Sequence, residues 1–393
     1  MELQSSFQSL FIISLLAFSI PIAATRLTVV RIPIVVGEIV AGIIVGRSGL
    51  DLVALDPSIE FLAAFGFAYL MFLSGLEIDF DLLLARRPKI GRDLFQDPLG
   101  LGIVTFVATL VVSFGASILL TWTGLVGNPW LMSLILSTTS VGIVMPILKE
   151  RKLTRSEWGQ AVLVSALVAD FATMLLITVV AAFLGGGGSF RFVLVLFLFA
   201  AFFLLHRLGL VFARRRSVAK VMVELAHTTA QIRVRGCFAL VLAFVALSLQ
   251  LGAEMILGAF LAGAIVALLA GRESHDLRAK LDAMGYGFFI PIFFIKVGMA
   301  FDLPALFDSS AALLAVPALA AAAYFVKIVP GLLFRVRYSW RQSLAAGVLL
   351  SSRLSLIVAA AAIGVRLGGH QRSGKRRNHP HRHHHEHSLT ASF

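Results

Sequence analysis

A single carboxylate, Asp170, lies in the middle of an otherwise apolar stretch that runs from residue 160 to residue 184. The stretch exceeds the roughly 20 residues that an α-helix needs to cross a bilayer. A charged side chain at that depth costs about 2.5–3.5 kcal/mol even on lenient insertion scales. A protein retains such a group where it binds a cation or a proton, or where it pairs with a neighbouring helix. We favour the binding interpretation, because an acid inside a membrane span marks an ion or proton pathway by default.

A second polar interruption lies one span earlier, at Thr138, Thr139 and Ser140. Small polar residues, here followed by Pro146, can break a helix and free backbone carbonyls to bind a cation. The alternative is a kinked helix whose hydroxyls bond back onto their own carbonyls. Because Asp170 lies in the next span, the cation-binding interpretation gains weight. A proton and a cation would then compete for one carboxylate.

Two basic residues lie inside later apolar spans, at Lys327 and Arg353. Lys327 could neutralise Asp170 when no ion is bound, or its ammonium could extend to the membrane surface. Arg353 could bind the carbonyl ends of a broken helix. These two residues are therefore candidate charge partners of the acidic site.

A further acidic residue, Glu38, lies in a glycine-spaced apolar stretch. Glycines at positions 37, 42 and 46 would let a neighbouring helix approach closely. We therefore attribute this stretch to helix packing.

The composition of the chain places these residues in a bilayer. Of the 393 residues, 59% are hydrophobic and only 14% are charged, which excludes an ordinary soluble domain. The apolar stretches are too long for the strands of a transmembrane barrel and lack their alternation. The single Cys237 excludes an internal disulfide and a cysteine-bound metal cluster. The sequence predicts an all-α polytopic membrane protein with twelve spans, at about residues 9–25, 32–46, 59–76, 98–120, 130–148, 160–184, 191–212, 236–251, 254–270, 283–300, 310–334 and 342–367.

Lysine and arginine are concentrated in the odd-numbered connections between these spans and are nearly absent from the even-numbered ones. Because basic loops stay in the cytoplasm, we expect a multi-pass protein of the inner cell membrane with its N-terminus outside. The net charge of +13 is then explained by the basic loops that set the membrane orientation, and no nucleic-acid partner is needed to explain it. No nucleophile–base pair indicates an enzyme, and no motif indicates a cofactor or a metal beyond a transported monovalent cation.

Motifs along nearly the whole chain resemble the monovalent cation:proton antiporter-2 family. They are PIVVGEIVAGIIVGRSGLDL, FLAAFGFAYLMFLSGLEIDFD, STTSVGIVMPILKE, PIFFIKVGMAFDL and GVLLSSRLSLIVAAAAIGVRLG. The resemblance implies two inverted repeats with thirteen helices, a core with two crossed broken helices, a homodimer, and exchange of Na⁺ or K⁺ for H⁺. By motif, Thr138, Thr139 and Ser140 fall on the first broken helix and Asp170 on the ion-binding aspartate. Lys327 falls on the lysine that partners this region.

The chain departs from the family pattern at Ala169, where relatives carry Asp, Asn or Gln. With one carboxylate, one-for-one exchange is the simpler hypothesis, although Lys327 could itself carry a proton. A potassium efflux system gated by a nucleotide-binding domain is disfavoured, because this residue differs and no such domain is evident. A membrane-embedded ion sensor that binds ions without transporting them is the alternative from another class.

The chain divides into a membrane exchanger domain at residues 1–367 and a basic, histidine-rich tail at residues 368–393. Histidine codons read as Ile, Met or Thr codons after a one-base shift, so the tail can be rewritten as an apolar stretch. We interpret the tail as a frameshifted final helix, which leaves twelve helices as written. An inactive paralogue that lacks the last helix is then the alternative to a working exchanger.

Overall fold

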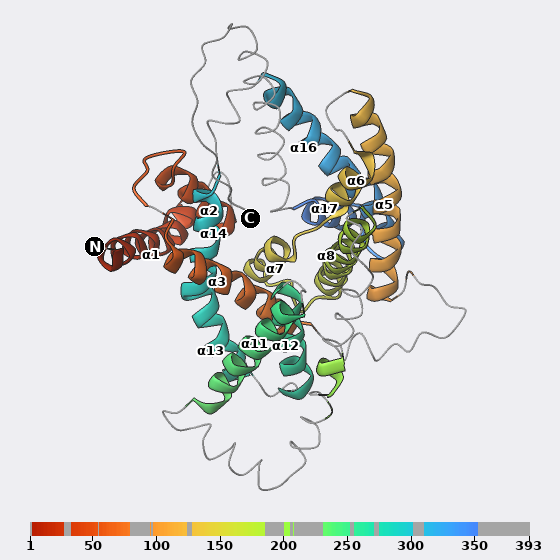
Figure 1. Cartoon of the computed structure of the whole chain (residues 1–393). Helices are drawn as coiled ribbons and strands as arrows, with labels where there is room; N and C mark the ends of the chain where they lie inside the picture. Colours follow the sequence, from red (N-terminus) through yellow and green to blue (C-terminus); the bar gives the residue numbers. More distant parts are fainter. Residues whose placement is uncertain are drawn as a thin grey trace, which may run out of the picture.

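The computed structural model describes residues 2–26, 33–53, 55–78, 95, 97–123, 128–184, 200–204, 207, 231–251, 255–270, 275–301 and 310–352. Helices make up most of this part, and no strand occurs in it (Figure 1). The main elements are α1 (Glu2–Arg26), α2 (Ile34–Val45), α3 (Pro57–Leu76), α5 (Pro98–Trp122), α6 (Pro129–Ser137), α7 (Val141–Glu150), α8 (Glu157–Leu184), α11 (Ile232–Gln250), α12 (Met255–Ala270), α13 (His275–Met284), the π-helix η1 (Gly285–Phe289), α14 (Ile290–Met299), α16 (Ser310–Gly331), the 3₁₀-helix η2 (Leu332–Val336) and α17 (Trp340–Leu350).

The helices confirm the predicted all-α membrane fold. Within the described residues, seven helical stretches are long and apolar enough to cross a membrane. The predicted span at 130–148 is divided into α6 and α7, and the span at 32–46 is the shorter helix α2. Most of the predicted span at 191–212, the second half of the one at 342–367, Arg353 and the tail at 368–393 lie outside the described residues.

Three of the membrane helices begin at the same local signal, an Asp or Asn followed by proline. The side chain of Asp56 accepts a hydrogen bond from the N–H of Ile59 at 2.9 Å, and Asp97 and Asn128 cap α5 and α6 in the same way. Such caps satisfy N–H groups that have no partner inside the helix, and proline fits the first helical position because it has no N–H to satisfy. The sequence therefore sets where these helices enter the bundle.

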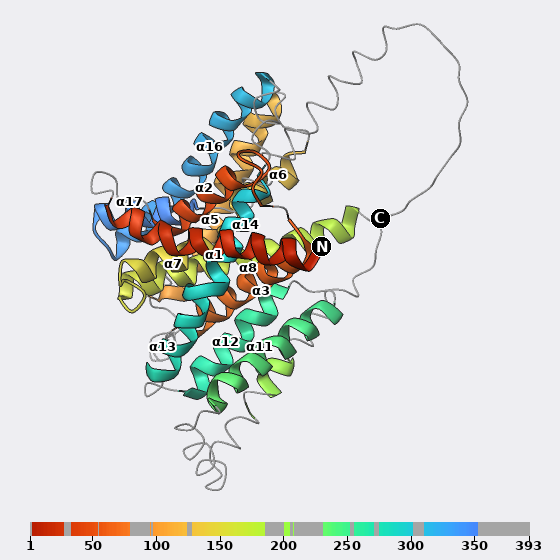
Figure 2. The same ribbon diagram turned by 90° about the vertical axis from the view of Figure 1, so that its left-hand side faces the viewer.

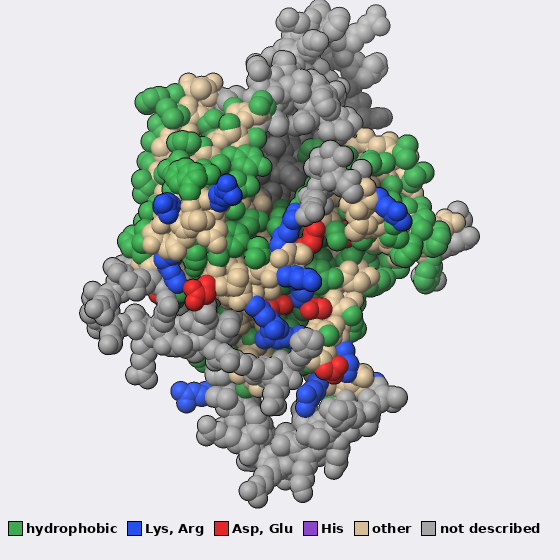
Figure 3. All heavy atoms as spheres, turned by 180° about the vertical axis from the view of Figure 1, so that it is seen from behind, with side chains coloured by type: hydrophobic (Ala, Val, Ile, Leu, Met, Phe, Trp, Pro, Cys, Tyr) green, Lys and Arg blue, Asp and Glu red, His purple; other side chains and the backbone are tan. Residues whose placement is uncertain are grey.

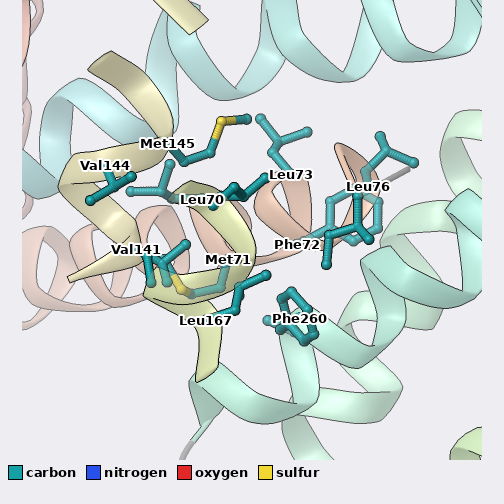
Figure 4. Close-up of a cluster of buried hydrophobic side chains, with 14 of the residues drawn as sticks. Leu70, Met71, Phe72, Leu73, Leu76, Val141, Val144, Met145, Leu167 and Phe260 are labelled. Atoms are coloured by element: carbon teal, nitrogen blue, oxygen red, sulfur yellow. The ribbon is translucent and has the colours of Figure 1, made fainter. Parts of the chain in front are cut away.

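The helices form two groups that meet at α7. One group contains α5, α6, α8, α16 and α17, and the other contains α1, α2, α3, α11, α12, α13 and α14 (Figures 1 and 2). Helix α7 packs against α8 of the first group and against α2 and α3 of the second. Apolar side chains fill this junction (Figure 4). Leu70, Met71 and Leu73 of α3 lie toward α7 and Leu167 of α8, and Phe72 and Leu76 lie toward Phe260 of α12.

Helices α2 and α14 approach each other through glycines, as their spacing predicted. A Cβ atom at Gly42 would overlap the carbonyl oxygen of Ile295, and one at Gly298 would overlap that of Ile39. Gly46 lies against the backbone of Met299 one turn further along. Only glycine allows this separation of the two backbones.

The described parts of the predicted third, fifth and ninth connections lie together at one end of the bundle. There, Lys149 at the end of α7 forms ion pairs with Glu77 at 2.9 Å and with Asp282 at 2.6 Å. Arg278 lies 3.9 Å from Glu77, so these four residues form what we call the Lys149 cluster. At the opposite end, the hydroxyl of Ser48 donates to the carbonyl of Phe301, both from even-numbered connections. Figure 3 shows one face on which charged side chains gather between two hydrophobic lobes.

Candidate ion-binding site

The helix break predicted at residues 138–140 is present and separates α6 from α7. The hydroxyls of Ser137 and Thr138 donate to the carbonyls of Leu134 and Ile135, at 2.8 and 2.9 Å. For these two side chains the alternative to a cation site is therefore observed, since their hydroxyls donate to carbonyls of their own helix. The next two residues behave differently.

Thr139 and Ser140 connect the break to the end of α17. The hydroxyl of Thr139 donates to the carbonyl of Leu350 at 3.1 Å, and the N–H of Ser140 donates to the carbonyl of Ser352 at 3.0 Å. Two helix ends that are more than 200 residues apart in the chain thus meet in the interior. The continuation of the chain after Ser352, where the second broken helix was expected, lies outside the described residues.

Lys327 on α16 reaches into the same junction. Its ammonium donates to the carbonyl of Ser137 at 2.7 Å and to the hydroxyl of Thr139 at 2.6 Å, and the residue is only 3% exposed. The proposed extension of this side chain to the membrane surface is therefore not what the structure shows. A cation at the last carbonyls of α6 is favourable, because the negative end of the helix dipole lies there.

Asp170 approaches the opposite end of the break. Its carboxylate lies near the backbone N–H of Val141, the first residue of α7, and close enough to Lys327 for the lysine charge to act on it. The N-terminus of a helix binds anions through its free N–H groups and positive dipole end. The break thus presents a positive helix end to the carboxylate and a negative helix end to the ammonium.

Helix α8 holds Asp170 in place through contacts on both sides of the residue. Its first turn is capped by the hydroxyl of Ser156, which accepts from the N–H of Gly159 at 3.0 Å. Ser165 packs directly on Gly102 of α5, and the ring of Phe171 meets that of Phe260 on α12 with 4.8 Å between centroids. Asp170 therefore lies between the two helix groups.

The family model described as the transmembrane sodium/hydrogen exchanger matches residues 13–373. The chain belongs to the sodium/hydrogen exchanger family. It is 41% identical over 368 residues to YjbQ of Bacillus subtilis (strain 168), a protein named as an Na⁺/H⁺ antiporter, with 92% of this chain and 58% of that protein covered. It is 30% identical over 310 residues to the glutathione-regulated potassium-efflux protein KefC of Klebsiella pneumoniae (strain 342), with 77% of this chain and 46% of KefC covered. The antiporter-2 resemblance is thereby confirmed.

A solved exchanger structure supports the fold. The sodium proton antiporter MjNhaP1 from Methanocaldococcus jannaschii matches with a TM-score of 0.57 and 16% identity, covering 95% of this chain and 89% of that one. The chain spans 58% of the length of the Bacillus relative and 46% of that of KefC.

Several groups in this candidate site were not identified from the sequence. They are the N–H of Val141 and the carbonyls of Leu350 and Ser352, all backbone atoms whose positions depend on where helices end. The start of a helix after the polar triplet could have pointed to Val141, because free N–H groups always occur there. Among the described residues, no group of three or more His, Cys, Asp or Glu side chains could hold a metal ion.

Proposed function

We propose that this chain is a secondary active transporter that exchanges a monovalent cation, Na⁺ or K⁺, for H⁺ by alternating access. Asp170 is the shared binding site. The observation that carries the proposal is the placement of this carboxylate at the first N–H of α7 and near the buried charge of Lys327. This placement occurs in a chain of the sodium/hydrogen exchanger family.

The oxygen atoms around the break support a cation site. The hydroxyl of Thr139 is shared between Lys327 and Leu350, so its main role is to hold the lysine and the end of α17. Within the described part, the side chain of Ser140 makes no hydrogen bond, so its hydroxyl is available. We assign the cation ligands to Asp170 and Ser140 together with the oxygen of Thr138.

The exchange follows from the cost of a charge in the membrane. A carboxylate that carries neither a proton nor a cation is costly to move past an apolar barrier, so Asp170 crosses with one or the other bound. Lys327 compensates the carboxylate when the site is empty. Because Ala169 contributes no second carboxylate, we propose one cation for one proton.

The topology and assembly form part of the same proposal. The Lys149 cluster and the other basic connections face the cytoplasm of a cell whose inner membrane the chain spans, and the N-terminus faces outside. A homodimer is proposed from the family resemblance. No nucleic acid takes part, and the lipid bilayer surrounds the apolar outer faces.

Two parts of the proposal concern residues outside the described ranges. Arg353 is proposed to bind the carbonyl ends of the second broken helix. Residues 368–393 are proposed to be a frameshifted final helix. Sequencing the gene across residues 367–393 tests the second point: a one-base difference that restores an apolar reading is expected, and confirmation of the histidine codons contradicts it.

The test of the function is exchange in liposomes by the Asp170→Asn variant. We expect loss of Na⁺/H⁺ and K⁺/H⁺ exchange with normal membrane insertion. Asp276→Asn is the matched control, because Asp276 has an 81% exposed side chain and lies in the Lys280 ion pair, away from the site. Exchange retained by Asp170→Asn would contradict the proposal. Proton release on cation addition without any flux in the unmodified chain would instead support the ion-sensing alternative.

A further inference from the structure

Glu38 is a second acidic residue that the membrane interior encloses. It lies on α2 and is 4% exposed, on the buried side of the helix together with Val35, Gly42 and Val45. Gly42 lies against the backbone of α14, so this side of α2 is the one that packs on α14. Among the described residues, the Glu38 carboxylate has neither a hydrogen-bond donor nor an ion-pair partner.

The charged groups on the helices around α2 do not neutralise Glu38. Lys149 at the end of α7 is bound to Glu77 and Asp282. Lys296 on α14, Arg26 at the end of α1 and Glu150 on α7 form no ion pair with Glu38 in the described part. An ionised carboxylate buried without a partner is very costly, so burial among the described residues favours a Glu38 whose charge is neutralised by a bound proton or cation.

The side of α2 that carries Glu38 distinguishes the two possible ligands. A monovalent cation that leaves water needs a shell of oxygen atoms to replace its hydration. The residues that share the buried side of α2 with Glu38 are Val35, Gly42 and Val45, which offer no side-chain oxygen. A proton needs only one carboxylate oxygen, so a proton is the ligand that fits.

The depth of Glu38 places it between the charged end of the bundle and Asp170. At that end, the N–H of Ile34, the first residue of α2, lies 3.4 Å from a carboxylate oxygen of Glu150, the last residue of α7. Glu38 is one helical turn further in, about 6 Å along α2. Val141, which contacts Asp170, is about 14 Å along α7 from Glu150. Helices α2 and α7 also pack against each other.

We propose that Glu38 is a proton-binding site on the route between the charged end of the bundle and Asp170. The proton binds to a carboxylate oxygen of Glu38 and leaves it again, and no other bond changes. This inference rests on the proposed function, because it names a residue that supplies protons to the exchange site. Glu38 acts before or after Asp170 and does not bind the transported cation.

The experiment compares Glu38→Gln with the unmodified chain and with Glu60→Gln, whose carboxylate is exposed on α3. Infrared difference spectra on raising the pH report the C=O band of a protonated carboxyl group that loses its proton. We expect Glu38→Gln to lose one such component and Glu60→Gln to keep it. In liposomes we expect Glu38→Gln to exchange at least about tenfold more slowly, with a changed pH profile, since a positioned proton donor typically contributes 100-fold or more.

The outcomes separate this proposal from the proposed function. An unchanged infrared band together with unchanged rate and pH profile in Glu38→Gln overturns the proton site. Cation-induced proton release at Asp170 should persist in Glu38→Gln, and its loss would show that Glu38 belongs to the cation site and would contradict the proposal. If Asp170→Asn is inactive while Glu38→Gln equals the unmodified chain, the proposed function stands and only the proton site fails.

Discussion

Replacing Lys327 with methionine should destabilise the junction of the two helix groups substantially. The change removes two short hydrogen bonds from a charged donor, at 2.7 and 2.6 Å, from a residue that is 3% exposed. Breaking a buried charged contact by removing one partner costs about 3–5 kcal/mol. Methionine is apolar and of similar length, so it recovers part of this loss through burial. We therefore expect a loss of about 3 kcal/mol, at the lower end of that range.

Thermal unfolding in detergent measures this effect. A loss of about 3 kcal/mol should lower the Tm by roughly 6 °C, at about 2 °C per kcal/mol for a large chain. Lys280→Met is the control, because in the described part of the chain Lys280 forms only an exposed pair with Asp276 one turn away. Such a pair contributes about 0.3–0.5 kcal/mol, so the control should shift the Tm by about 1 °C. Equal shifts in the two variants would refute the role of Lys327 in holding the junction.

A double-mutant cycle then tests the coupling of Lys327 to Asp170. If the lysine charge compensates the carboxylate, Lys327→Met combined with Asp170→Asn should be less destabilised than the sum of the single variants. Residues that interact with each other typically show a coupling of about 0.5–3 kcal/mol. If the destabilisation of the double variant equals the sum of the two single variants, Lys327 stabilises only the helix ends and does not compensate Asp170.

Three further predictions concern the residues that hold the junction and the helices around it. Thr139→Val should lower the Tm by roughly 2–4 °C and slow exchange, because it removes one of the two acceptors of Lys327 and leaves the buried carbonyl of Leu350 without its donor. A Tm and exchange rates that match those of the unmodified chain would contradict this. Gly42→Ala should destabilise or misfold the chain because its Cβ would overlap the α14 backbone, whereas Gly115→Ala, with open space around it, should leave the Tm unchanged or slightly raised in the same scan. Lys149→Met should lower the Tm by only about 2 °C, because the ion pairs of Lys149 are partly exposed. A decrease in Tm as large as that of Lys327→Met would show that burial does not determine how much these charged contacts stabilise the chain.

The spans and the polar residues could be read from the sequence, because apolar length and isolated polar groups are local signals. The break at 138–140, the helix of Asp170 and the glycine contact of α2 were all predicted and are observed in the described residues. The direction of the Lys327 side chain could not be predicted. A lysine in an apolar span can reach outward or inward, and only the position of the carbonyl of Ser137 decides between them.

The long-range contacts were also beyond prediction from one sequence. Thr139 and Leu350 are separated by 211 residues, and Lys149 and Asp282 by 133, so no local pattern relates them. The glycines around Glu38 indicated packing, and that packing is observed. They gave no sign that the carboxylate itself would be enclosed without a partner among the described residues, because this depends on what α14 and α7 present to α2.

The most direct test of the central claim is proton release from purified protein when Na⁺ or K⁺ is added. If a proton and a cation compete for Asp170, cation addition to the protonated protein should release about one proton per chain in weakly buffered solution. Asp170→Asn should release none, while Asp276→Asn should behave like the unmodified chain. Undiminished proton release by Asp170→Asn would contradict the account.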